Sequence, residues 1–107
     1  MSLSTATPSR DHATLVDDLC RALLTPRDER EMAGLLVDLC TPAEIRTLAE
    51  RWHVARLLAE TKLSYREIHD ATGASTTTIV RVARFLKQEP NKGYRRAIES
   101  IGGGDAD

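Results

Sequence analysis

Apolar residues along this chain recur at intervals of three and four positions, which is the spacing of one face of an α-helix. The pattern predicts helices over residues 11–24, 27–39, 42–61 and 94–101, with two shorter helices between 63 and 86. It therefore predicts an all-α fold of six helices. The first apolar stripe consists of Leu15, Val16, Leu19, Cys20, Leu23 and Leu24.

Two threonine–proline pairs indicate helix starts. Thr25–Pro26 and Thr41–Pro42 each offer a cap residue followed by proline at the first helical position, and Glu44 completes a capping box after the second pair. The long helix from Pro42 is expected to direct a stripe inward that consists of Ile45, Leu48, Ala49, Trp52 and Leu57 or Leu58. The tryptophan in this stripe is interpreted as a core residue and not as part of a ligand site.

The segment 63–86 has the features of a helix-turn-helix. Ser64 and Glu67 have the spacing of a capping box, in which each side chain bonds a free backbone N–H of the other residue. Gly73 is able to adopt the positive φ that closes the first helix. The second helix is expected to be capped by Ser75 or Thr76 and to bury Ile79, Val82, Ala83 and Leu86.

The outer face of this second helix is suited to DNA. Burying the apolar face points Thr77, Arg81 and Arg84 outward, with Thr76 and Val80 beside them. A polar, cationic face without carboxylates matches the major groove. The predicted DNA-binding residues are Arg66, His69, Ser75, Thr76, Thr77, Val80, Arg81, Arg84 and Lys87. The histidine of this set lies near a position where helix-turn-helix units usually carry a small residue.

The charge is distributed unevenly. The chain has 107 residues, enough for one domain with a core, and a net charge of −1. Residues 1–60 carry seven Lys/Arg against ten Asp/Glu, whereas residues 61–101 carry eight against four. Positive charge therefore gathers where DNA phosphates would need it. The expected organisation is a disordered tail over 1–9, a helical DNA-binding domain over 10–101 with its helix-turn-helix at 64–87, and a disordered tail over 102–107.

Several other classes of protein find no support. No apolar run reaches the ~20 residues of a membrane span and no signal peptide is present, so a cytoplasmic protein without membrane contact is expected. Cys20 and Cys40 are expected to be buried, reduced thiols. No paired carboxylates, nucleophile–base set, phosphate loop or metal-ligand cluster stands out. The sequence therefore predicts neither an enzyme nor a bound cofactor or metal.

Three segments together resemble the tryptophan repressor superfamily. They are LLVDLCTPAEIRTLAERWHVARLL, LSYREIHDATGASTTTIVRVARFL, and a proline followed by a final helix. The resemblance covers about two thirds of the chain, from Leu35 to about Ser100, and points to the YerC/YecD-type, TrpR-like branch. It implies an all-helical, intertwined homodimer in which N-terminal and C-terminal helices cross between the subunits.

The resemblance also bears on an effector pocket. Arg51 and Arg81 match two arginines that hold tryptophan in the repressor, and Thr41 matches too. Val82 stands where the repressor has a glycine, and Phe85 where it has a serine that hydrogen-bonds the ligand. These larger side chains leave little room for indole, so L-tryptophan is not expected to be the co-repressor. Asp38, Glu50 or Asp70 is expected to neutralise the two arginines; otherwise Thr41, Arg51, Arg81 and Phe85 are candidates to hold another small anionic effector.

These patterns favour a homodimeric transcriptional regulator that binds specific double-stranded DNA and acts as a repressor. Two alternatives stay open at this point. One is a helical module that contacts another protein through the same scaffold, and the other is a transposase-like DNA-binding domain.

Overall fold

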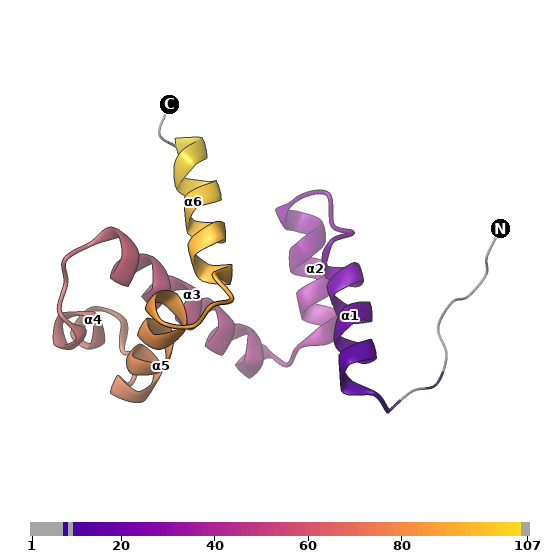
Figure 1. Ribbon diagram of the computed structural model, residues 1–107, viewed down its shortest axis with the longest axis horizontal. Helices are drawn as coiled ribbons and strands as arrows, with labels where there is room; N and C mark the ends of the chain where they lie inside the picture. The colour runs from indigo at the N-terminus through magenta and orange to yellow at the C-terminus, as the bar shows by residue number, and fades with distance from the viewer. Residues whose placement is uncertain (1–7, 9, 106–107) are drawn as a thin grey trace. The chain divides into compact units, whose positions relative to one another are not determined.

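The computed structural model of the chain describes residues 8 and 10–105, and every regular element within them is a helix (Figure 1). The predicted all-α fold of six helices is therefore confirmed. The chain divides into two compact units, with the boundary along the chain between Thr41 and Pro42. The helices are α1 (His12–Leu23), α2 (Glu29–Leu39), α3 (Pro42–Glu60), α4 (Tyr65–Thr72), α5 (Thr76–Lys87) and α6 (Gly93–Asp105).

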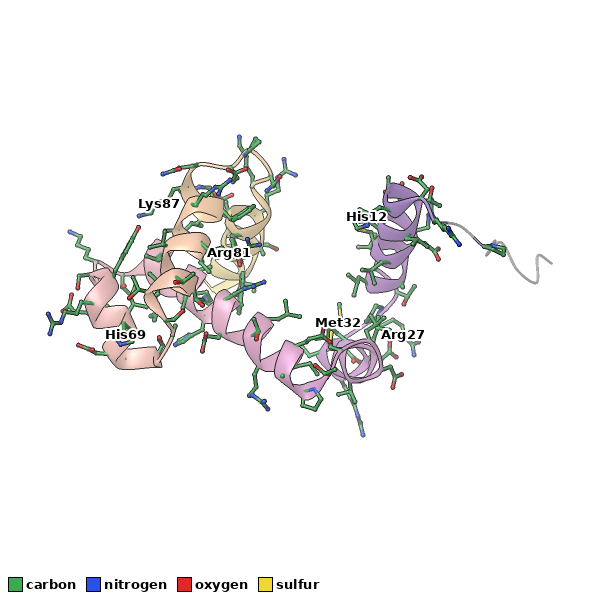
Figure 2. The ribbon with its side chains drawn as sticks, turned by 90° about the horizontal axis from the view of Figure 1, so that it is seen from below. His12, Arg27, Met32, His69, Arg81 and Lys87 are labelled. Atoms are coloured by element: carbon green, nitrogen blue, oxygen red, sulfur yellow. The ribbon has the colours of Figure 1, made fainter. Side chains whose placement is uncertain are left out.

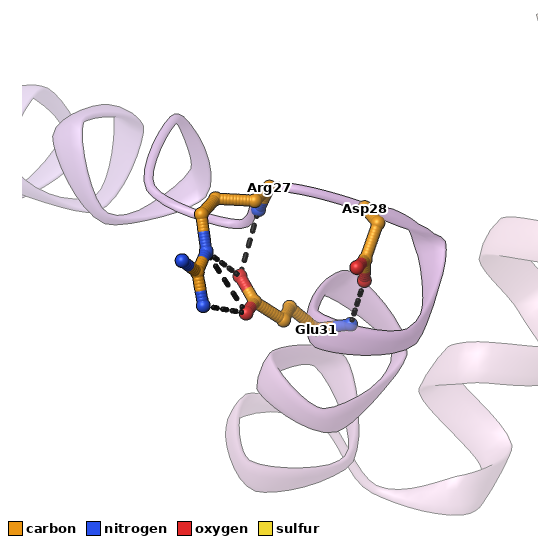
Figure 3. Close-up of polar contacts among 3 residues, drawn as sticks. All are labelled: Arg27, Asp28 and Glu31. Atoms are coloured by element: carbon orange, nitrogen blue, oxygen red, sulfur yellow. Dashed lines mark hydrogen bonds and ion pairs between the residues drawn. The ribbon is translucent and has the colours of Figure 1, made fainter.

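In the N-terminal unit, α2 begins later than its sequence predicts. The cap is Asp28 and not Thr25, because an Asp28 carboxylate oxygen accepts from the Glu31 N–H at 2.9 Å (Figure 3). Glu31 in turn accepts the Arg27 N–H at 2.8 Å and forms an ion pair with the Arg27 guanidinium at 2.8 Å. These bonds lower the pKa of Glu31, and the bond from the Arg27 side chain contributes most to this shift. A charged carboxylate satisfies the positive helix start, and Thr25 instead donates its hydroxyl to the carbonyl of Ala22 at the end of α1.

The apolar stripe of α1 is largely exposed in the single chain. Leu15 is 51% exposed and Leu19 is 40% exposed, and neither α1 nor α2 contains a buried residue. The two helices, of 12 and 11 residues, are too short to cover each other's apolar faces. The expectation of buried thiols is wrong for the same reason, because Cys20 is exposed and Cys40 is half-buried, both as free thiols.

The core of the C-terminal unit lies around the second half of α3, which contacts α4, α5 and α6. The same arrangement is visible in Figure 1. Trp52, Leu57, Leu58 and Tyr94 pack against the buried residues, and the Trp52 and Tyr94 rings stack with centroids 6.5 Å apart. The interpretation of Trp52 as a core residue is confirmed. The buried residues of this core are Val54, Ala55, Ile68, Ala74, Ile79, Val82, Leu86 and Ile98.

The inward face of α3 differs from the predicted stripe. Leu48 is 46% exposed and Ala49 is exposed, whereas Val54 and Ala55 are completely buried. The predicted stripe assumed that the whole helix is covered along one line. The buried residues of α3 lie in its second half, so burial there follows the positions of α4, α5 and α6.

The C-terminal helix is longer than its sequence predicts. The helix before it ends at Lys87, shortly before Pro90, and Lys92 adopts a φ of 62° just before α6. The last helix then continues through the glycines at 102–104 to Asp105, so the tail predicted from 102 is wrong as far as 105. Glycine weakens a helix but retains its N–H, unlike proline, so hydrogen bonding can propagate through it. The predicted tail 1–9 lies outside the described residues apart from Pro8, as do 106–107.

Among the helices that the structure describes, none combines the length and the apolar character that a membrane span requires.

Candidate nucleic-acid interface

The first helix of the candidate interface, α4, begins with the predicted capping box. The Ser64 N–H donates to a Glu67 carboxylate oxygen at 2.8 Å, and the Glu67 N–H donates to the Ser64 hydroxyl at 3.1 Å. The bond from the Ser64 backbone, followed by that from its side chain, lowers the pKa of Glu67. Two backbone donors are thereby satisfied, which fixes the start of a helix of only eight residues.

The turn between α4 and α5 also follows the sequence prediction. Gly73 has a φ of 78°, a left-handed conformation that is strained for other residues, and its N–H closes α4 on the carbonyl of His69. The cap of α5 is Ser75 and not Thr76, because the Ser75 hydroxyl accepts the Thr78 N–H at 3.1 Å. The second helix therefore begins at Thr76, where Thr76 and Thr77 are exposed and Thr78 is half-buried.

The two faces of α5 separate as predicted. Its inner face is buried through Ile79, Val82, Ala83 and Leu86. On its outer face Val80 is 51% exposed, and Thr76, Thr77, Arg81, Arg84 and Lys87 are exposed as well. Figure 2 shows Arg81 and Lys87 on α5 and His69 on the neighbouring α4. The helix sequence contains no carboxylate, and the cations of its outer face are Arg81, Arg84 and Lys87, which follow the threonines of its start.

Two arginines of this face contact the ring of Phe85. The Arg81 guanidinium lies 4.5 Å from the ring centroid and that of Arg84 lies 5.5 Å from it. Arg84 also bonds Glu89 at 3.0 Å, through its Nε. Cation–π contacts of this kind restrict the arginine rotamers. Their signal in the sequence is an aromatic residue four positions after one arginine and next to another, which the sequence prediction missed.

The candidate effector pocket is only partly assembled in the C-terminal unit. Arg51 is half-buried, and among the described residues of this unit neither Arg51 nor Arg81 pairs with a carboxylate. The expected neutralisation by Glu50 or Asp70 is therefore wrong. Thr41 and Asp38 belong to the N-terminal unit. An open hollow of about 320 Å³ lies at the junction of α5 and α6 and is lined by Phe85, Asn91, Gly93 and Tyr94.

No group of three metal-ligating side chains occurs among the described residues. The features that the structure does assemble are a capped α4, a glycine turn and an α5 with a cationic outer face. The sequence profile of the Trp repressor protein family matches residues 13–101, which include all of these features. The chain belongs to this family.

Individual members support the assignment to the Trp repressor family. The uncharacterized protein YerC of Bacillus subtilis strain 168 is 41% identical over 86 residues, which are 80% of this chain and 81% of that protein. A crystal structure of a TrpR-like protein from Eubacterium eligens has 40% identity and a TM-score of 0.76, covering 83% of this chain and 90% of that one. A candidate Trp repressor from Staphylococcus aureus has 34% identity and the same TM-score, covering 83% and 87%.

Membership of the Trp repressor family indicates what kind of interface this is. The Trp repressor family consists of helix-turn-helix DNA-binding regulators and not of enzymes, and this chain is a TrpR-like member of the YerC type. In such a unit α5 is the recognition helix and α4 supports it.

Proposed function

We propose that the protein is a homodimeric transcriptional repressor that reads the major groove of specific double-stranded DNA through α5 and does not use L-tryptophan as its co-repressor. The observation that carries the proposal is the outer face of α5, which exposes threonines at its start and arginines and a lysine further along. A regulator of this kind works where the DNA is, in the cytoplasm.

The positions along α5 suggest two kinds of contact. Recognition helices meet base edges near their N-termini, where Thr76, Thr77 and Val80 are exposed. The arginines and the lysine suit phosphates, which position the protein without reading sequence. Phosphate contacts are proposed for Arg66, Ser75, Arg81, Arg84 and Lys87.

Two substitutions separate these roles. Thr77→Ala should reduce the preference for a selected duplex over a random duplex, because it removes a contact to a base edge. Lys87→Ala should weaken binding to both duplexes by a similar factor and lower the salt slope by about one, because it removes one phosphate contact. Fluorescence anisotropy over a range of salt concentrations measures both effects. If neither substitution changes affinity for the selected duplex, the proposed surface is wrong.

The same titration tests DNA binding itself. Neutralising phosphates releases counterions, so the logarithm of the association constant should fall linearly with the logarithm of the salt concentration. A mainly apolar contact with another protein would depend far less on salt. Wild-type protein that binds duplex DNA with no salt dependence, or not at all, would favour a protein-interaction module.

The argument against tryptophan rests on Val82 and Phe85. Val82 is buried in the core and Phe85 is half-buried, so a glycine and a serine of the repressor are replaced by side chains that fill space. The Arg81 guanidinium already lies over an aromatic ring, that of Phe85. The Phe85 ring therefore replaces a bound indole beside Arg81, and DNA binding should need no co-repressor.

Titration calorimetry with L-tryptophan tests this prediction. No heat of binding is expected, and affinity for a selected duplex should be the same with and without saturating tryptophan. A micromolar dissociation constant, or affinity that rises tenfold (~1.4 kcal/mol of coupling), would contradict it. Arg51→Ala serves as the comparison in a screen of small anionic metabolites, because an anion held in the candidate pocket should bind the wild type and not this variant.

A further inference from the structure

A histidine spans the turn of the helix-turn-helix. The Nδ1 of His69, on α4, lies 2.7 Å from the carbonyl oxygen of Ala74. Ala74 is completely buried, and its own N–H donates to the hydroxyl of Thr72 at 3.0 Å. Two side chains of α4 therefore hold the two backbone polar groups of one residue in the turn.

The geometry determines which nitrogen carries the hydrogen. A carbonyl oxygen only accepts, so Nδ1 of His69 must be the donor, and Nε2 of the neutral ring is unprotonated. The carbonyl in question belongs to the peptide group that joins Ala74 to Ser75, the cap of α5. The imidazole therefore acts on the peptide group from which the recognition helix starts.

Two other bonds at the turn close α4. The Gly73 N–H closes the helix on the carbonyl of His69, and the Thr72 hydroxyl donates to the carbonyl of Ile68 at 2.7 Å. Within the described residues, the His69 ring makes the only side-chain bond from α4 to the peptide group that leads into α5.

We propose that His69 is a positioning residue for DNA recognition. Its Nδ1–H···O bond fixes the direction in which α5 leaves the turn, and with it the placement of Thr76 and Thr77 against base edges. His69 thus acts through Ala74 instead of touching DNA. This inference rests on the proposed DNA-binding function.

Nitrogen NMR of the free protein tests the bond without DNA. The chain has three histidines, so the signals can be assigned with His12→Gln and His53→Gln variants. In a buffer basic enough to keep all rings neutral, His69 should show the Nδ1–H tautomer. A ring that carries its hydrogen on Nε2 would overturn the proposal, because that ring could not donate to Ala74.

Matched variants test the effect on DNA. The comparison is between His69→Asn and His69→Leu, because asparagine and leucine have the same shape but only the asparagine amide offers a donor near the place of Nδ1. His53→Ala is the control, because His53 is exposed on α3. The probes are a duplex that the wild type selects from a random pool and a random duplex of equal length.

His69→Leu should bind the selected duplex about tenfold more weakly while binding the random duplex almost as well, and His69→Asn should recover most of the loss. His53→Ala should bind like the wild type. The proposal is overturned if the leucine variant retains full preference, or if asparagine rescues nothing. If the leucine variant does not fold, the tautomer and the asparagine variant decide. If the wild type selects no duplex, the proposed function fails, and the tautomer alone still tests the bond.

Discussion

An aspartate in place of Leu19 on α1 should convert the proposed homodimer into a monomer whose N-terminal helices are poorly folded. Leu19 is 40% exposed in the single chain and belongs to a stripe with Leu15 and Val16, which are exposed too. Burying one leucine side chain contributes ~1.5–3 kcal/mol, and a two-fold dimer contains two copies. Because association can bury only the exposed 40% of Leu19, the two copies should lose about 1–2.5 kcal/mol, so the substitution should weaken association roughly tenfold before the cost of burying a charge is added.

Sedimentation equilibrium measures this result directly. The wild type should have twice the chain mass of 11.8 kDa at micromolar concentration, and its melting temperature should rise with concentration, because dissociation accompanies unfolding. His12→Asp is the control, since it places an aspartate at the start of the same helix, where a negative charge is favourable. A wild-type monomer at these concentrations would contradict the prediction.

A dimer also has a functional reason. One recognition helix contacts few base pairs, and two half-sites about one helical turn apart require two copies of α5. Leu19→Asp should therefore lower affinity for a selected duplex much more than Thr77→Ala does, although Leu19 lies in the other unit of the chain from α5.

The helix-turn-helix was predictable because its signals are local. A capping box needs two residues three apart, the turn needs one glycine, and the inner face of α5 follows from a strict 3, 4, 7 spacing of apolar residues. Each of these features is determined by residues at most seven positions apart in the sequence. The faces of α5 and the start of α4 were consequently correct to the residue.

The errors occurred where several local signals compete or where burial depends on distant elements. Thr25–Pro26 and Asp28 both offer a helix start, and the charged cap with its Arg27–Glu31 partners prevails. Along α3, Leu48 and Val54 are equally apolar, and only the positions of the other helices decide which is buried. The bond from His69 to Ala74 depends on the path of the turn, which residue spacing does not give.

Ile79→Ala should destabilise the C-terminal unit by ~2–5 kcal/mol, the usual cost of such a substitution in a core. Ile79 lies on α5, is completely buried and is among the largest side chains in the core. That core contains few residues, Val54 and Ile68 being the other large ones without exposure, so little remains to fill the space left behind. Against a typical total stability of ~5–15 kcal/mol, the loss is severe.

Thermal unfolding followed by circular dichroism should show a melting temperature lower by at least about 10 °C. Val80→Ala is the matched control: it removes methyl groups from the next residue of α5, whose side chain is 51% exposed, and should change stability by less than ~0.5 kcal/mol.

The two variants should also differ in DNA binding. Near its melting temperature the Ile79 variant should lose affinity for the random and the selected duplex together, because the outer face of α5 is lost when the helix unfolds. The Val80 variant should lose only its preference for the selected duplex. A core that tolerates alanine at Ile79 with less than ~1 kcal/mol of destabilisation, well below the usual range, would show that α5 is held by something other than its buried face.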